Sequence, residues 1–226
     1  MHAQPARTAT LRPVRPAAPQ PPPPKPVRQA PTGTLVAYVR SGRTIAIRSA
    51  PNGPVVAQLS SRTQFGSQRT FAVTRAAHGL RVITTELPNG RTGWVEPNGA
   101  LRLSRTTVSL DVDLSSRLLR VRVGSRLVRA MRVGIGAPGT STPTGRFAIT
   151  DKLRGSNYSS VYGCCILALS GHQTNLPPGW TGGDRLAIHG GSTGGAGSTG
   201  CLHAGEGDLR FLMRSVPLGA QITIHP

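Results

Sequence analysis

The sequence contains no apolar run that approaches the length of about eighteen residues needed to span a bilayer as a helix. The amino-terminal stretch MHAQPARTATLRPVRP has arginines but no apolar segment behind them, so it does not predict a signal peptide. The chain as given is therefore not expected to be an integral membrane protein, and this terminus indicates no export route.

Acidic and aromatic residues are also scarce. Eight Asp and Glu stand against 27 Lys and Arg, which gives a formal charge of +19, and Phe, Trp and Tyr make up 4% of the chain. The basic residues are nearly all arginine and are spread along the whole chain. Nucleic-acid binders concentrate basic residues on one face and interleave aromatics. A general attraction to polyanions is expected here, but nucleic-acid binding is not.

Cysteine is rare, since the chain has only three. Cys164 and Cys165 are adjacent in a strand-like segment, which predicts buried, inert thiols and no disulfide framework. His172, His189, His203 and Cys201 are numerous enough to hold a metal ion. They lack Cys-x-x-Cys or His-x-x-x-His spacing, so we expect no metal site.

Changes in composition divide the chain into three parts. Residues 1–33 contain ten of the twenty prolines and few residues that could form a core, which predicts an extended linker. Residues 34–103 consist of short alternating runs separated by turns, with Asn89-Gly90 as a hairpin signal, and predict a small β-barrel with Trp94 in its core.

Residues 106–226 are again mostly strand-like. VSLDVDLSSRLLRVRVG indicates two strands joined at Ser115-Ser116, and RFAITDKL and QITIHP indicate further strands. GDLRFLMRSV has the apolar spacing of a helix. The predicted fold class is therefore mainly β, a small barrel followed by a β-rich sandwich with one or two short helices.

The segment IHGGSTGGAGSTGCLH places a histidine and a cysteine at the two ends of a glycine-rich loop. A cysteine acts as a nucleophile through its thiolate, which needs a nearby base and hydrogen-bond donors for the developing oxyanion. His189 follows the strand-like LAIH, and Gly200 permits a tight turn before Cys201. This pattern indicates acyl transfer through a thioester. Composition alone would equally allow a histidine and a cysteine that are structural and do not act together.

The order of motifs resembles the L,D-transpeptidase catalytic domain, the YkuD-type fold. That family's signature is an Ile-His-Gly strand end, a variable loop, and a Ser-x-Gly-Cys turn followed by an aliphatic residue. Ile188-His189-Gly190 and Ser198-Thr199-Gly200-Cys201-Leu202 match it, and MRVGIGAPGTSTPTGRFAIT, SVYGCCILALSG and GDLRFLMRSVPLGAQITI resemble neighbouring family segments. Upstream, IAIRSAPNGPVVAQL and GRTGWVEPNGAL resemble a bacterial Src-homology-3-like domain.

The resemblance implies a role for each matching residue. Cys201 would be the nucleophile, His189 the base, and the carbonyl of Gly190 the group that orients the imidazole. The remaining candidates would shape the turn, supply oxyanion-hole amides or line the substrate cleft: Ser198, Thr199, Gly200, His203, Tyr162 and, in the loop NLPPGWTGGD, Trp180.

The sequence departs from the family pattern at three places. The family usually has His or another long polar residue where Thr199 stands, an Arg where His203 stands, and a longer loop between the histidine and the cysteine. Loss of that Arg puts binding of a substrate carboxylate in doubt, although His203 or Arg210 could replace it.

By resemblance, the function is peptidoglycan L,D-transpeptidation in the cell envelope or outside the cell. Cys201 would attack the third residue of a stem tetrapeptide, release D-alanine and pass the acyl group to an amine of a neighbouring stem. No cofactor is implied, and expected partners are stem peptides, anionic wall polymer and covalently bound carbapenems. Three alternatives stay open: an L,D-carboxypeptidase with the same pair, a non-catalytic wall-binding protein, and a nucleic-acid-binding module.

Overall fold

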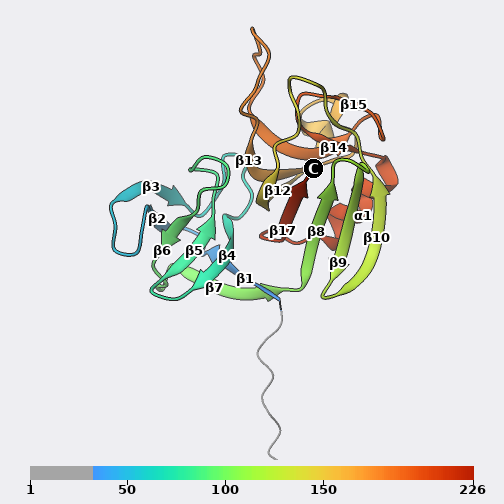
Figure 1. The fold of residues 1–226 in the computed structure, drawn as a ribbon. Helices are drawn as coiled ribbons and strands as arrows, with labels where there is room; N and C mark the ends of the chain where they lie inside the picture. The colour runs from blue at the N-terminus through green and yellow to red at the C-terminus, as the bar shows by residue number, and fades with distance from the viewer. Residues whose placement is uncertain (1–32) are drawn as a thin grey trace, which may run out of the picture. The chain divides into compact units, whose positions relative to one another are not determined.

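The computed structural model describes residues 33–226, which are mainly β with one α-helix. The predicted linker, residues 1–33, lies outside the described residues except for Gly33. The first seven strands form one curled antiparallel sheet in the order β3-β2-β6-β5-β4-β1-β7 (Figure 1). Their bounds are β1 (Thr34–Val39), β2 (Thr44–Arg48), β3 (Val55–Ser60), β4 (Thr70–Ala76), β5 (Leu80–Ile83), β6 (Gly93–Val95) and β7 (Leu101–Thr106).

Alternation explains the core of this barrel-like sheet, because successive strand side chains point to opposite faces. Ala37 and Val39 of β1 and Ile45 and Ile47 of β2 are buried in one cluster. The prediction that Trp94 belongs to this core is wrong. In β6 its neighbours Gly93 and Val95 are buried and Trp94 is half-exposed, since the inward positions of this strand are the odd ones.

The remainder forms an eight-stranded sheet in the order β10-β9-β8-β17-β12-β13-β14-β16 and a separate parallel pair, β11 with β15. The bounds of the larger sheet are β8 (Val108–Asp113), β9 (Leu118–Val123), β10 (Arg126–Arg132), β12 (Gly145–Arg154), β13 (Cys165–His172), β14 (Arg185–Gly190), β16 (Leu202–Ala204) and β17 (Gln221–His225). The pair consists of β11 (Ile135–Gly136) and β15 (Ala196–Ser198). The predicted mainly β fold class is confirmed.

One helix, α1 (Glu206–Ser215), packs against β13 and β14. Leu209 and Leu212 are fully buried and belong to the same cluster as residues of β8 and β9, so the sheet curls around this helix. Glu206 and Asp208 lie in the first turn of the helix and Arg214 in the last, which suits the helix dipole. Two single-turn 3-10 helices, Gly155–Asn157 and Ser160–Tyr162, precede β13.

The two sheets share a buried contact. Ala72 of β4, Ile83 of β5 and Ala148 of β12 form a small apolar cluster. Asn89 donates to the main-chain O of His172 (2.7 Å) and accepts from its N–H (2.9 Å). The predicted Asn89-Gly90 turn does lie between antiparallel strands, β5 and β6, but it belongs to a longer connection whose asparagine side chain contacts β13.

The connection between the two sheets is a single residue. β7 runs to Thr106, which pairs with Thr34 of β1, and β8 begins at Val108. Residues 32–226 form one compact unit by their contacts. The barrel-like sheet and the larger sheet are therefore joined closely in the chain and through the apolar cluster.

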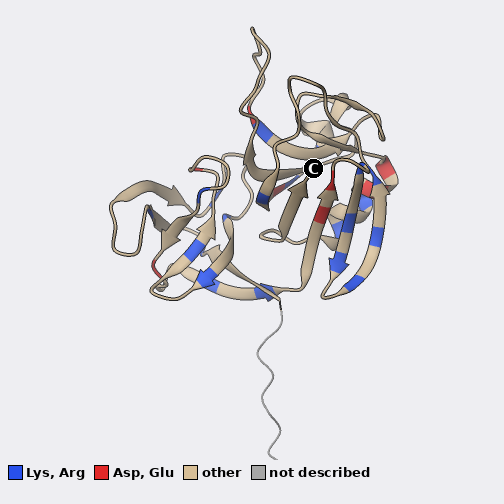
Figure 2. Cartoon of the chain, in the orientation of Figure 1, with Lys and Arg blue, Asp and Glu red and all other residues tan. Residues whose placement is uncertain are grey.

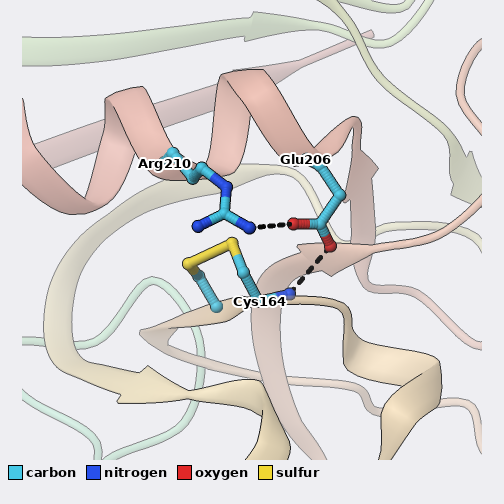
Figure 3. Close-up of a disulfide and its surroundings, with 4 residues drawn as sticks. Cys164, Glu206 and Arg210 are labelled. Atoms are coloured by element: carbon cyan, nitrogen blue, oxygen red, sulfur yellow. Dashed lines mark hydrogen bonds and ion pairs between the residues drawn. A yellow bond between two sulfur atoms is a disulfide. The ribbon is translucent and has the colours of Figure 1, made fainter.

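The structure overturns the prediction of two inert thiols at Cys164 and Cys165, because it joins these adjacent residues in a disulfide (Figure 3). Cys164 precedes the first residue of β13 and is half-exposed, which sequence alternation did not indicate. Its N–H donates to Glu206 Oε1 at 2.8 Å, and Glu206 Oε2 lies 3.4 Å from Arg210 Nη2. The hydrogen bond from Cys164 N–H to Glu206 therefore connects the disulfide, at the start of β13, to the start of α1.

Lys and Arg are distributed over strands of both sheets, including β9 and β10 (Figure 2). This matches the dispersed charge seen in the sequence. Across residues 33–226, none of the helices has the length and apolar character required to cross a membrane.

Candidate active site

A cleft of about 1350 Å³ lies over one face of the larger sheet. Its floor comes from Leu153 of β12, Ile166 and Ala168 of β13, and Ala187 and His189 of β14. Successive side chains of β14 point to opposite faces, so Ala187 and His189 face the cleft while Leu186 and Ile188 are buried in the core with α1. All predicted site residues except Gly200 line this cleft: Tyr162, His189, Gly190, Ser198, Thr199, Cys201 and His203.

Parallel pairing of β14 with β16 brings the two ends of the glycine-rich loop together. Ile188 pairs with Leu202 and His189 with His203. Cys201 immediately precedes Leu202, so its register position is beside Ala187, and its side chain and that of His189 lie on the same face. The sequence indicates only that the glycine-rich loop allows Cys201 to approach His189. The pairing of β14 with β16 brings the two residues together.

Three contacts hold the imidazole of His189. Its Nδ1 lies 2.8 Å from the carbonyl O of Gly190, so Nδ1–H donates there and Nε2 keeps its lone pair. Tyr162 packs edge-on against the ring with centroids 4.8 Å apart, and the ring of His203 lies 4.7 Å away. Gly190 must be glycine because a Cβ there would lie 2.8 Å from the N of Gly163. The histidine is therefore fixed in one tautomer and orientation.

The side-chain hydroxyl of Ser198 holds the turn before Cys201 in place. Ser198 Oγ donates to the carbonyl O of Cys201 at 2.5 Å and accepts from Gly200 N at 3.1 Å. Gly200 has φ +99°, and a Cβ at this position would lie 2.1 Å from Nε2 of Gln173. Both the backbone conformation and the lack of space require glycine there.

Gln173 is a buried residue of this site that sequence reasoning missed. Its Nε2 donates to the carbonyl groups of Thr140 (3.0 Å), Ser141 (3.1 Å) and Thr199 (3.3 Å). It thus ties the loop APGTSTPTG to the cysteine turn. The only available signal was a polar amide directly after the buried run of β13, which is too common a feature to be specific.

Arg185 was missed as well. Its guanidinium donates to the carbonyl O of Leu169 and to Thr150 Oγ1 (2.8 Å), and burial lowers its pKa while Asp151 opposes that shift. Its own carbonyl accepts from the Cys201 thiol, with Sγ 3.9 Å from the O atom. Within residues 33–226 the resting thiol makes this contact and no hydrogen bond to His189.

Burial sets the protonation states of His189 and Cys201. It lowers the pKa of His189 to about 4, with the nearby His203 adding to the shift and the Gly190 hydrogen bond opposing it. Burial also raises the pKa of the Cys201 thiol, against a main-chain hydrogen bond from Ala187. The resting pair at neutral pH is therefore a neutral imidazole with a neutral thiol.

The remaining candidates have different positions. Burial lowers the pKa of His203, so it supplies no standing positive charge for a substrate carboxylate. Arg210 does not line the cleft, because it lies on α1 beside Glu206. His172 lies apart from the pair, with Nδ1 2.9 Å from Asp184 Oδ2 and Nε2 2.8 Å from the O of Thr85. Across residues 33–226, no three His, Cys, Asp or Glu side chains form a metal-binding group.

The neutral buried imidazole predicts a pH dependence of stability. Between pH 6.5 and about 4 the unfolded chain binds a proton at His189 that the folded chain does not, so stability falls as pH falls through this window. The free energy of unfolding should drop by at most about 3 kcal/mol more in the wild type than in His189→Gln. Urea unfolding of both proteins at pH 7, 6, 5 and 4.5 checks this. Parallel pH profiles for the two proteins would contradict it.

Residues 107–224 match the family model of the YkuD L,D-transpeptidase catalytic domain. A putative L,D-transpeptidase YkuD of Bacillus licheniformis is 32% identical over 120 residues, which are 51% of this chain and 64% of that protein. The match thus spans less than two thirds of that relative.

Two solved structures are similar at lower identity. An L,D-transpeptidase from Mycobacterium smegmatis is 16% identical with a TM-score of 0.40, over 60% of this chain and 73% of that one. L,D-transpeptidase 3 from Mycobacterium tuberculosis, with a faropenem-derived adduct, is 18% identical with a TM-score of 0.41, over 60% and 73%. Because the family model covers more than half of the sequence, the chain belongs to the YkuD family of L,D-transpeptidase catalytic domains.

Proposed function

We propose that the protein is a peptidoglycan L,D-transpeptidase that uses Cys201 as its nucleophile and His189 as its base. The single observation that supports this most is the parallel pairing of β14 and β16, which sets both side chains on the floor of one cleft. Family membership supplies the reaction class. The site also contains the orienting hydrogen bond from His189 to Gly190 O that such a pair needs.

The reaction begins with acylation. Nε2 of His189 takes the thiol proton while Sγ of Cys201 attacks the carbonyl carbon of the third stem residue. The amide C–N bond then breaks, and His189 gives the proton to the departing nitrogen of D-alanine, which leaves a thioester. Main-chain N–H groups of Thr199 and Cys201 are the oxyanion donors, since Gly200 N already donates to Ser198 Oγ.

Deacylation reverses these roles. An amine of a neighbouring stem attacks the thioester carbonyl, His189 accepts the amine proton, and the proton returns to Sγ as the C–S bond breaks. The starting low pKa of His189 keeps Nε2 unprotonated and ready for both steps. An L,D-carboxypeptidase would differ only in using water as acceptor, and no observation on the cleft favours it.

The barrel-like sheet and the location of the protein complete the proposal. The seven-stranded antiparallel sheet supports a Src-homology-3-like domain, with Gly93-Trp94-Val95 on its late strand β6. Its arginines suit an anionic wall polymer, and a peptidoglycan substrate requires the cell envelope or the exterior as the site of action. The half-exposed Trp94 is available to a wall ligand on the outside of the sheet.

The experiment that tests this function is incubation with a stem tetrapeptide, with and without an amine acceptor, followed by mass spectrometry. We expect release of D-alanine, a thioester on the protein in the absence of acceptor, and a cross-linked product in its presence. Release of D-alanine with only a hydrolysed tripeptide, even at high acceptor concentration, would establish the carboxypeptidase instead. Absence of both products and of the thioester would reject catalysis.

A further inference from the structure

The barrel-like sheet contributes side chains to the cleft of the catalytic domain. Gln64 and Phe65, in the connection between β3 and β4, line the same cleft as Cys201 and His189. Phe65 is half-buried, and its ring packs edge-on against Tyr158 with centroids 6.3 Å apart. The guanidinium of Arg185 lies over the Phe65 ring, 5.8 Å from its centroid. An aromatic side chain from one sheet thus forms a wall over the other.

The loop that holds Phe65 is anchored to the catalytic domain. Thr63 Oγ1 donates to Asp151, a completely buried carboxylate of β12, and Phe65 N donates back to Thr63 Oγ1 at 3.3 Å. The loop is closed by bonds from Thr63 N to Ser67 O (2.9 Å) and from Gly66 N to Thr63 O (3.0 Å). Phe65 is therefore held in place without any substrate, as a positioning residue needs to be.

The surroundings of Phe65 are exposed and apolar. Tyr158, Val161 and Trp180 all line the cleft, with 47%, 69% and 45% of their surfaces exposed. Large apolar side chains gathered and exposed at one cleft indicate a binding surface for a ligand with apolar or peptide groups. The cleft volume exceeds what a single small molecule fills, so it accommodates an extended peptide.

The position of Phe65 relative to the catalytic pair identifies which part of a substrate it would contact. Along β14 the order is Arg185, then Ala187 beside Cys201, then His189. Arg185, and with it Phe65, therefore lies on the side of Cys201 away from His189. The departing and incoming amines both exchange a proton with His189, so both occupy the histidine side of the thioester. The acyl portion must extend the other way.

We propose that Phe65, with Tyr158, forms a subsite for the acyl portion of the donor peptide, the residues that precede the carbonyl attacked by Cys201. This inference rests on the proposed function and deepens it, since it assigns to the barrel-like sheet a role in selecting the donor. Phe65 acts by covering the donor backbone and its aliphatic groups. It has no part in proton transfer.

Binding to a Cys201→Ala protein tests the subsite without turnover. In that background, Phe65→Ala should weaken the binding of a stem tetrapeptide about tenfold, the typical effect of removing one aromatic contact. Phe65→Tyr should restore it. The matched control is Val56→Ala, a barrel residue of β3 that is 44% exposed and does not line the cleft; it should leave binding unchanged. Equal affinities for the Phe65→Ala and Val56→Ala proteins would overturn the proposal.

Steady-state kinetics of proteins that retain Cys201 distinguish a donor subsite from a structural role. Phe65→Ala should raise the donor KM about tenfold for the tetrapeptide with kcat within about twofold, and leave the acceptor KM unchanged. A donor shortened to its acetylated last two residues should react equally with both proteins. Equal losses for long and short donors, or a rise in the acceptor KM alone, would overturn the inference. If the wild type binds the tetrapeptide but never releases D-alanine, the proposed function fails while the binding result still decides the subsite.

Discussion

Replacement of Cys201 by alanine is expected to lower D-alanine release from a stem tetrapeptide by at least about 10⁴-fold. The change removes the only thiol that lines the cleft, since Cys164 and Cys165 are joined in a disulfide. The effect is measured as the rate of D-alanine release, which is determined by chromatography of the products.

The fold should survive this substitution. Cys201 is half-buried and its Sγ contacts only main-chain groups, the O of Arg185 at 3.9 Å and the N–H of Ala187, so the expected loss of stability is within about 1 kcal/mol. Thermal unfolding of the variant checks this. Cys201→Ser is the matched control for shape, because it keeps the side-chain volume and still lacks an accessible thiolate. Retained turnover in a correctly folded alanine variant would show that another residue forms the acyl intermediate.

Much of the fold follows from local sequence patterns. Alternation predicted the strands from Val108 to Asp113 and from Leu118 to Val123 with their turn, and helical spacing at Leu209 and Leu212 predicted α1. These patterns work because burial on one face imposes a period of 2 on a strand and about 3.6 on a helix. Trp94 was predicted in the barrel core but is only partly buried, because Gly93 and Val95 occupy the inward positions of β6.

The site was predictable where the residues form a local motif. His189, Gly190 and the Ser198–Cys201 turn lie within sixteen residues of sequence that match a family signature, and the structure brings them to one cleft. Gln173, Arg185 and Phe65 were not predictable, since each acts through contacts with distant parts of the chain. Gln173 reaches Thr140, and Phe65 reaches Arg185. No periodicity encodes pairings of this kind, which depend on how strands and loops pack.

The disulfide between Cys164 and Cys165 illustrates a further limit. Two adjacent cysteines in an apolar run predict side chains on opposite faces of one strand, which would keep their sulfur atoms apart. The structure places Gly163, with φ +67°, and Cys164 in a turn and starts β13 only at Cys165. Cys164 is therefore a turn residue, and the alternation argument does not apply to it.

A carbapenem is expected to form a one-to-one covalent adduct at Cys201, and formation should depend on His189. The strained lactam carbonyl presents the same kind of electrophile as the stem amide. Sγ bonds to the carbonyl carbon, the lactam C–N bond breaks, and the thiol proton passes through His189 to the ring nitrogen. The resemblance to L,D-transpeptidases implies faster acylation by carbapenems than by penicillins.

Loss of the base should slow this acylation strongly. Burial raises the pKa of the Cys201 thiol, so without His189 little thiolate forms at neutral pH. His189→Ala is expected to reduce the acylation rate by about 10²–10⁴-fold, the usual contribution of general base catalysis. Intact-mass kinetics measure the rate, and peptide mapping locates the adduct.

The controls for this prediction separate the base from its neighbours. His203→Ala removes the adjacent imidazole, which lies 4.7 Å from that of His189 but makes no hydrogen bond to Gly190. It should slow acylation far less than His189→Ala, because the Nδ1 contact that fixes the His189 tautomer is retained. Equal losses in the two variants would mean that the histidines act as one unit. Undiminished labelling in His189→Ala, or an adduct on the peptide that contains Cys164 and Cys165, would show that the base or the nucleophile has been misassigned.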